Sequence, residues 1–123
     1  MLFRSELIII NDSSSDGTGQ EIERFLDFVD THKIYSKTIS YRYFHTTIPL
    51  FESRCDDFGI RIAKSNYVLE VQADMKILQK SYDRALKQVA EGNQDFALIS
   101  CRGVHLFSDL FYGELLKIGR AHV

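Results

Sequence analysis

Two groups of polar side chains each follow an apolar run in this sequence, and that spacing can serve ligand binding. The first group is segment 11–18, Asn-Asp-Ser-Ser-Ser-Asp-Gly-Thr, in which Asp12 offers an acceptor for a base or a ribose hydroxyl. The small side chains leave backbone N–H groups free to face a ligand. A turn of this composition is also common without a ligand, so the segment alone leaves both interpretations open.

The second group, Gln72-Ala73-Asp74, places a carboxylate after the apolar run 67–71. Mg²⁺ takes oxygen ligands, usually one or two from the protein together with substrate phosphates. Asp74 is therefore a candidate ligand for Mg²⁺ or Mn²⁺, and the cation would neutralise charge on a departing diphosphate. A helix cap or a solvated turn is the alternative role for a single Asp at the end of a strand.

Alternating strands and helices would position these two groups. The unbroken apolar run within residues 6–11 predicts a strand buried on both faces of a parallel sheet. Further strands are predicted at 34–44, 67–71 and 96–100, and helices at 22–29, 51–63, 81–91 and 110–117. This alternation indicates an α/β fold with a mostly parallel sheet, in which ligands bind beyond the carboxyl ends of the strands. We therefore expect Asp12 and Asp74 on one rim.

The composition suits a single domain over residues 1–123 and excludes several classes of protein. The apolar fraction of 45% is enough for a core, and the formal net charge is −2. No run of basic residues is present, so nucleic acid is not an expected partner. Cys55 and Cys101 form no CxxC pair, which argues against structural zinc and fits a reducing compartment.

The sequence shows no membrane span and no signal peptide. Its longest apolar run, residues 7–10, is far shorter than the about 18 residues that a span needs. We expect a cytoplasmic protein, located at the cytoplasmic face of a membrane only if segments outside this chain attach it. Residues 2–5 and 118–123 resemble translated sequencing-adapter DNA, which indicates an environmental read of a gene that continues in both directions. Ordinary polar tails are the alternative.

Three motifs in order resemble the inverting family-two glycosyltransferases, which have the Rossmann-like GT-A fold. The motifs are Asp-x-Ser-x-Asp-Gly-Thr at 12–18, Gly-Ile-x-x-Ala-x-x-x-Tyr at 59–67 and x-Ala-Asp at 72–74. The resemblance covers residues 6–77 and implies an incomplete nucleotide-diphospho-sugar transferase domain. It implies that the parent transfers a sugar from a nucleotide-diphosphate donor, a UDP-sugar, to an acceptor hydroxyl with inversion. The acceptor, whether saccharide, lipid or protein, stays open.

The resemblance also implies roles for five donor-binding residues. Asp12 matches the acid that contacts the nucleoside, and Ser13 stands where the family usually has glycine. Asp74 matches the metal and diphosphate ligand of the Asp-x-Asp signature, in which Gln72 replaces the first acid. Asp57 stands in place of an asparagine and can still accept hydrogen bonds.

Several other side chains have a structural alternative to a functional role. Asp56 stands where the family has a phosphate-binding arginine, so Arg54 or Arg61 would have to compensate. Asp16 suits the start of a helix, Cys55 lies on an apolar stripe, and His105 follows the last predicted strand. The aromatic group Tyr41, Tyr43, Phe44 and His45 either stacks on a base or sugar or packs in the protein.

The general base is not visible after Asp74, where the acids are isolated, so we expect it to be encoded downstream and the chain to be inactive alone. An inactive nucleotide-sugar-binding homologue is the first alternative. A receiver-like signalling module needs a lysine near Ser100-Cys101-Arg102, and none is there. A nucleotidyltransferase needs a glycine-rich, basic loop where Ser13-Ser14-Ser15-Asp16 is acidic.

Overall fold

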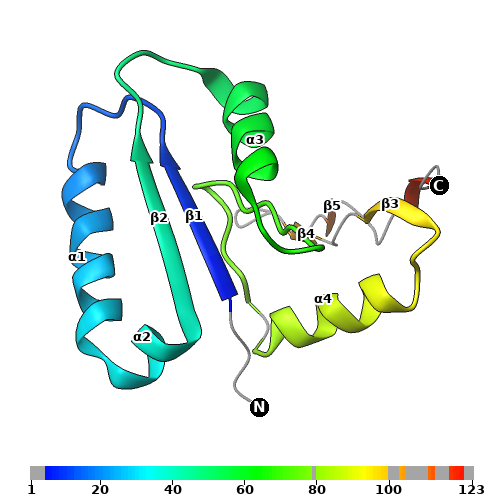
Figure 1. The fold of residues 1–123 in the computed structure, drawn as a ribbon. Coiled ribbons are helices and arrows are strands. Elements are labelled where there is room, and N and C mark those ends of the chain that lie inside the picture. Colours follow the sequence, from blue (N-terminus) through cyan, green and yellow to red (C-terminus); the bar gives the residue numbers. More distant parts are fainter. Residues whose placement is uncertain (1–4, 79, 100–102, 105–110, 113–116, 121–123) are drawn as a thin grey trace. The chain divides into compact units, whose positions relative to one another are not determined.

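The computed structural model describes residues 5–78, 80–99, 103–104, 111–112 and 117–120, with side chains described up to residue 95. The chain divides into two compact units, Met1–Glu70 and Val71–Val123, and each is described by itself. The described part is a small α/β arrangement with a two-stranded parallel sheet and flanking helices (Figure 1).

The parallel sheet of the first unit consists of β1 (Ser5–Asn11) and β2 (Ile39–His45). The strands pair in register from Ser5 opposite Ile39 to Asn11 opposite His45. Their carboxyl ends therefore meet at one edge, where the loop after β1 begins (Figure 1). The strand predicted at residues 6–11 is confirmed, but its residues 6–10 are half-buried, so the expected burial on both faces is wrong.

Helix α1 (Thr18–Thr31) follows the loop, in agreement with the predicted apolar stripe. Leu26 and Val29 form its buried side, with exposed fractions of 7% and 1%. They are the buried apolar side chains in the part of the chain whose side chains are described, so the core of this unit is small.

Helix α2 (Lys33–Thr38) replaces the first half of the strand predicted at 34–44, and that part of the prediction is wrong. The hydroxyl of Thr38 donates to the carbonyl of Ile34 at 2.8 Å, and that of Ser36 donates to the carbonyl of Lys33 at 3.3 Å. Both bonds run from a side chain to a carbonyl of the preceding helical turn. Ile34 is also strongly exposed, so no burial favours a strand there.

Helix α3 (Phe51–Ile62) confirms the helix predicted at 51–63. It approaches β1 closely, because a Cβ atom on Gly59 would lie 3.4 Å from Cδ1 of Ile10. The rings of Phe58 and Phe44 meet edge to face with centroids 4.9 Å apart, which joins α3 to β2. α3 is therefore fixed over the sheet by contacts with both strands.

The strand predicted at residues 67–71 is wrong, because this segment pairs with no strand. Tyr67, Val68, Leu69 and Val71 are each about half exposed, so their β-forming side chains gain little burial. β-propensity reflects packing on a sheet surface, and here no such surface covers them.

The described residues of the second unit contain α4 (Tyr82–Glu91), as predicted for 81–91, and four short strands. β3 (Phe96–Ile99) pairs antiparallel with β6 (Lys117–Arg120), and β4 (Gly103–Val104) pairs antiparallel with β5 (Phe111–Tyr112). The strand at 96–100 is thus confirmed over 96–99, but its pairing is not parallel.

The final helix predicted at 110–117 is wrong at residues 111, 112 and 117, which lie in strands. Phe and Tyr favour strands over helices, which accounts for the difference at 111–112. The rest of that prediction lies outside the described residues. Within the described ranges, no helix has the length and hydropathy needed to cross a membrane.

Candidate functional site

The loop after β1 is tied to both strand ends by Asn11. Its side chain is 3% exposed, and its Nδ2 donates to the hydroxyl of Tyr43 at 3.1 Å. Its Oδ1 accepts the backbone N–H of Ser14 at 3.3 Å, and its carbonyl accepts the N–H groups of Ser13 and Thr46. Tyr43 therefore holds the loop in place. Of the two roles considered for the aromatic residues, stacking on a ligand or packing in the protein, Tyr43 has the structural one.

Ser13 adopts a left-handed backbone conformation with φ of 53°. A residue with a Cβ rarely adopts this conformation, and glycine does so without steric penalty. The finding gives a physical reason for glycine at this position in the family that the sequence resembles. Ser13 adopts this conformation at the expense of local strain.

Asp16 starts α1 as expected. Its Oδ1 accepts the backbone N–H of Thr18 at 3.0 Å and also the hydroxyl of Thr18. The bond from this hydroxyl is the main reason why the pKa of Asp16 is lowered, and the N–H bond adds to it. Asp16 thus has a structural role at the first residue of the helix.

Asp12, the expected nucleoside contact, binds the segment that leads into α3. Its Oδ1 accepts the hydroxyl of Thr46 at 2.9 Å and the N–H of Leu50 at 2.8 Å, and its Oδ2 accepts the N–H of Phe51 at 2.8 Å. Cys55 of α3 lies near enough to influence the pKa of this carboxylate. The Leu50 bond is the largest cause of the lowered pKa of Asp12, and the other donors add to it.

Cys55 is half-buried, and burial is the main cause of its raised pKa, with the negative charges of Asp12 and Asp56 adding to it. A raised thiol pKa means little thiolate at neutral pH, so this cysteine is a poor nucleophile. Its position beside Asp12 is a structural one.

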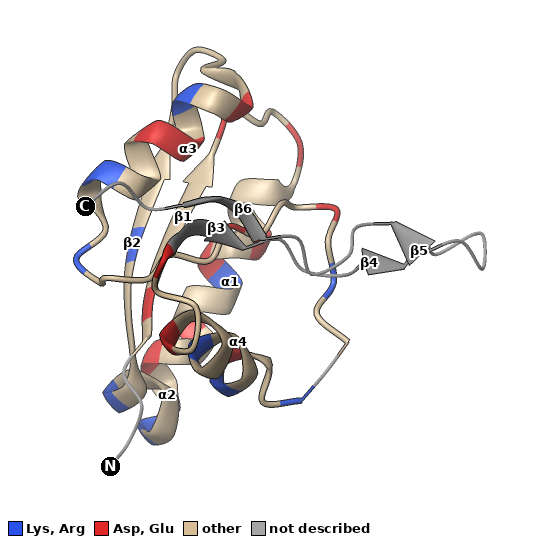
Figure 2. Ribbon diagram, turned by 90° about the vertical axis from the view of Figure 1, so that its right-hand side faces the viewer, with Lys and Arg blue, Asp and Glu red and all other residues tan. Residues whose placement is uncertain are grey.

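Asp57 lies on the exposed surface of α3. Both of its carboxylate oxygens accept Nε of Arg61 at 2.9 Å, one turn later in the helix. The bond that Arg61 donates to Asp57 raises the pKa of Arg61. Figure 2 shows acidic and basic segments side by side on α3, so this helix does not present a field of one sign.

Three carboxylates that the sequence reasoning missed gather in the first unit. Ligand atoms of Glu52, Asp56 and Glu70 lie within 4.8 Å of one another. The spacing of Glu52 and Asp56 by four residues places both on one face of α3, which the sequence could have indicated. Glu70 joins them only through the tertiary structure. Exposed acids often gather without a metal, so this cluster alone assigns no site.

Gln72 and Asp74 lie in the second unit, in a turn closed by the N–H of Met75 and the carbonyl of Gln72 at 3.0 Å. Asp74 is exposed. Because Asp12 belongs to the first unit and each unit is described by itself, the shared rim for Asp12 and Asp74 stays a prediction. Cys101 and His105 lie outside the described residues.

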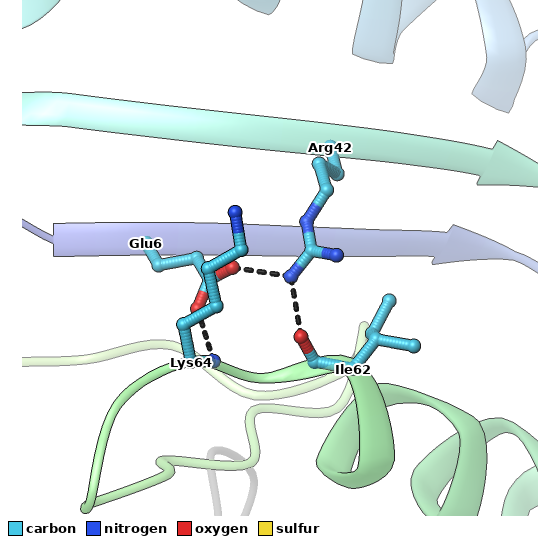
Figure 3. A network of polar contacts seen from close by, with 4 residues as sticks. All are labelled: Glu6, Arg42, Ile62 and Lys64. Carbon is cyan, nitrogen blue, oxygen red and sulfur yellow. Dashed lines mark hydrogen bonds and ion pairs between the residues drawn. The ribbon is translucent and has the colours of Figure 1, made fainter.

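A hollow of about 370 Å³ lies at the amino ends of β1 and β2, opposite the edge with Asp12. Figure 3 shows its polar network: Arg42 donates from Nη2 to Glu6 and to the carbonyl of Ile62, and Glu6 accepts the N–H of Lys64. The Lys64 bond is the largest cause of the lowered pKa of Glu6. The carboxylate of Glu6 pairs with Arg42 and accepts the N–H of Lys64, so the network joins the sheet to the end of α3.

Comparison with known proteins adds no family: no protein-family model, no curated protein and no solved structure matches this chain.

Proposed function

We propose that this chain is the donor-binding part of a family-two glycosyltransferase with the GT-A fold. The parent transfers a sugar from a nucleotide-diphosphate sugar, a UDP-sugar, to an acceptor hydroxyl with inversion. The feature of the structure that supports this proposal is the loop after β1.

The observation that carries the proposal is the left-handed conformation of Ser13 at the carboxyl end of a parallel strand. The three-motif resemblance places the family's glycine at this position, and the backbone there has the conformation that glycine favours. Ligands of parallel α/β sheets bind beyond the carboxyl ends of the strands, where this loop lies.

In this proposal the loop with Asp12 and Ser13 receives the nucleoside, and Asp74 holds Mg²⁺ or Mn²⁺ on the diphosphate. An exposed carboxylate in a turn suits a cation that takes one protein ligand and several phosphate oxygens. Asp57 and Gln72 add hydrogen bonds to the donor, and Arg54 or Arg61 stands in for the family's phosphate-binding arginine.

The test is a calorimetric titration of the 123-residue chain with UDP in the presence of Mn²⁺. We expect binding that weakens at least about tenfold in Asp74→Ala, because one charge-assisted metal bond is lost. Asp95→Ala, which removes another exposed acid of the second unit, is the matched control and should bind as the wild type does. No binding of UDP by the wild-type chain would refute the proposed function.

A homologue that binds the donor without transferring it is the second candidate. Gln72 and Asp56 favour it, because each removes a charge that the resemblance associates with metal or phosphate. A protein that extends to the downstream base, binds UDP with Mn²⁺ and yet neither transfers nor hydrolyses the donor sugar would decide for this candidate.

A further inference from the structure

We infer that the hollow at the amino ends of β1 and β2 binds a phosphate group, either the free ion or the end of a small phosphomonoester. The hollow has a volume of about 370 Å³, and all of its lining residues belong to the first unit. Cavities that bind small molecules have volumes of about 300–1,000 Å³, so a phosphate group with a small organic part has room here. The inference does not depend on the proposed function, because the loop after β1 lies at the opposite ends of the same strands (Figure 1).

The lining of the hollow carries more positive than negative charge. Arg42 and Lys64 contribute one positive charge each and Glu6 one negative charge, so the formal charge of the lining is +1. The Glu6 side chain is 14% exposed and that of Arg42 is 34% exposed, so an incoming ligand meets the cation more readily than the carboxylate. The lining thus attracts an anion. The other lining residues are uncharged: Ser5, Ser40, Tyr41 and Ser65.

Lys64 has a fixed backbone and an unpaired ammonium group. Its backbone N–H donates to Glu6 at 2.9 Å, which holds the residue just after the end of α3. Its ammonium group makes neither a hydrogen bond nor an ion pair with any described residue. Figure 3 shows this side chain extending toward the strands on the same side as the Arg42 guanidinium. A charge in this position can bind an external anion without breaking an existing contact.

Arg42 is held in place but keeps unused donors. Both of its hydrogen bonds start at Nη2, one to Glu6 and one to the carbonyl of Ile62 at 2.6 Å. A guanidinium has five N–H groups, so those on Nε and Nη1 have no partner among the described residues. No buried side-chain nitrogen in the described part of the chain lacks a partner, so these N–H groups are accessible to solvent. An anion can accept them while the network of Figure 3 stays intact.

Two hydroxyl groups add donors beside these cations. Ser40 lies two residues before Arg42 in β2 and therefore on the same face of the strand, and Ser65 follows Lys64. Both serines are exposed, and their hydroxyls make no hydrogen bond with a described residue. A phosphate group offers three terminal oxygens and a carboxylate only two. Donors from β2 and from the segment after α3 therefore suit phosphate better than a carboxylate.

The test is a titration of the isotope-labelled full chain with inorganic phosphate, followed by amide NMR at about pH 7 and a constant ionic strength of about 0.15 M. We expect saturable shifts of the amides of residues 40–42 and 64–65, half complete at about 1–10 mM phosphate, as a few charge-assisted bonds to an exposed ion allow. Acetate should bind at least about tenfold more weakly, because it offers fewer acceptor oxygens. Shifts that do not saturate, or equal binding of acetate, would overturn the inference.

A second titration, with glycerol phosphate, separates the two sources of the phosphate group. Tighter binding than that of inorganic phosphate assigns the hollow to a phosphomonoester, and weaker binding assigns it to the free ion. If neither compound binds, the inference is wrong.

Variants locate the site. Lys64→Gln removes the unpaired charge and keeps the backbone bond to Glu6, so it should melt as the wild type does and bind phosphate at least about tenfold more weakly. Lys64→Arg keeps the charge and should bind within about threefold of the wild type. Ser40→Ala removes one hydroxyl donor and should weaken binding about threefold. Lys33→Gln, which changes an exposed lysine of the same unit outside the hollow, is the matched control and should bind as the wild type does.

Unchanged phosphate binding in Lys64→Gln, or an equal loss in Lys33→Gln, would overturn the inference. The proposed function is tested separately, because binding in the hollow needs no metal. Asp74→Ala should leave phosphate binding unchanged, and Lys64→Gln should leave the binding of UDP with Mn²⁺ unchanged. Loss of phosphate binding in Asp74→Ala would assign the ion to the donor site and not to the hollow.

Discussion

The backbone N–H of Phe51 donates to Oδ2 of Asp12 over 2.8 Å, across 39 residues of sequence. This bond joins the carboxyl end of β1 to the first residue of α3. Asp12, to which the motif assigns a ligand contact, therefore also stabilises the first unit. Its protonation or replacement should change the stability of the chain.

The carboxylate of Asp12 should make stability depend on pH. Its pKa is lowered in the folded chain, mainly by the Leu50 N–H, so its contribution is present above the pKa of the unfolded chain. That contribution is lost as the pH falls through the lower folded pKa. The melting temperature of the wild type should exceed that of Asp12→Asn at about pH 7 by several degrees, and the gap should close toward about pH 2. A difference in melting temperature that stays constant from about pH 7 to about pH 2 would contradict a stabilising role for the ionised Asp12 carboxylate.

Replacement of Ser13 by glycine should stabilise the chain. The left-handed strain at φ 53° is relieved, which outweighs the greater freedom of glycine in the unfolded chain, and we expect a gain of about 1 kcal/mol. Ser14 is not among the residues with positive φ, so Ser14→Gly should lose about 0.5–1 kcal/mol. Urea denaturation measures the free energy of unfolding of both variants. If both substitutions change it in the same direction, the left-handed conformation of Ser13 is contradicted.

The buried stripe of α1 should dominate the stability of the first unit. Leu26→Ala removes one of its buried side chains and should lower the free energy of unfolding by about 2–5 kcal/mol. Phe25, its neighbour, is 45% exposed, so Phe25→Ala should lower it by about 0.5 kcal/mol. Denaturant titration measures the free energy of unfolding of the two variants. A larger loss in Phe25→Ala than in Leu26→Ala would show that the buried stripe of α1 is not the core of this unit.

Arg42 should matter much more than other arginines of the first unit. Arg42→Met leaves Glu6 without its cation and removes a donor to the Ile62 carbonyl, so we expect a loss of about 1–3 kcal/mol. Arg24 makes only an exposed pair with Glu21, and Arg24→Met should lose less than about 1 kcal/mol. Comparable losses in thermal or urea unfolding would show that the network in Figure 3 does not hold α3 to the sheet.

Local pattern was sufficient for several elements. The apolar run before Asn11 predicted β1, and the helical spacing of Leu26 and Val29 predicted α1. The bond of Asp16 to the first residue of α1 could also be read from residue types, because its partner Thr18 lies two residues away. Each of these depends on neighbours within one or two turns, so the sequence contains the required information.

Local pattern failed where neighbouring chain segments decide the conformation. Residues 34–38 have strand-forming side chains but lie in α2, and the strong exposure of Ile34 shows that no burial favours a strand there. Residues 67–71 have the composition of a strand and pair with none. β-propensity measures the fit to a sheet surface, so it cannot predict whether a surface is available.

By itself, the sequence determined which residue types follow β1 and that a polar loop ends that strand, because composition and periodicity act locally. Only the tertiary structure decided what Asp12 touches: its hydrogen-bond partners lie at residues 46, 50 and 51, and no spacing in the sequence relates them to it. A carboxylate binds whichever donors the fold brings within reach, and that depends on how α3 crosses the end of the sheet.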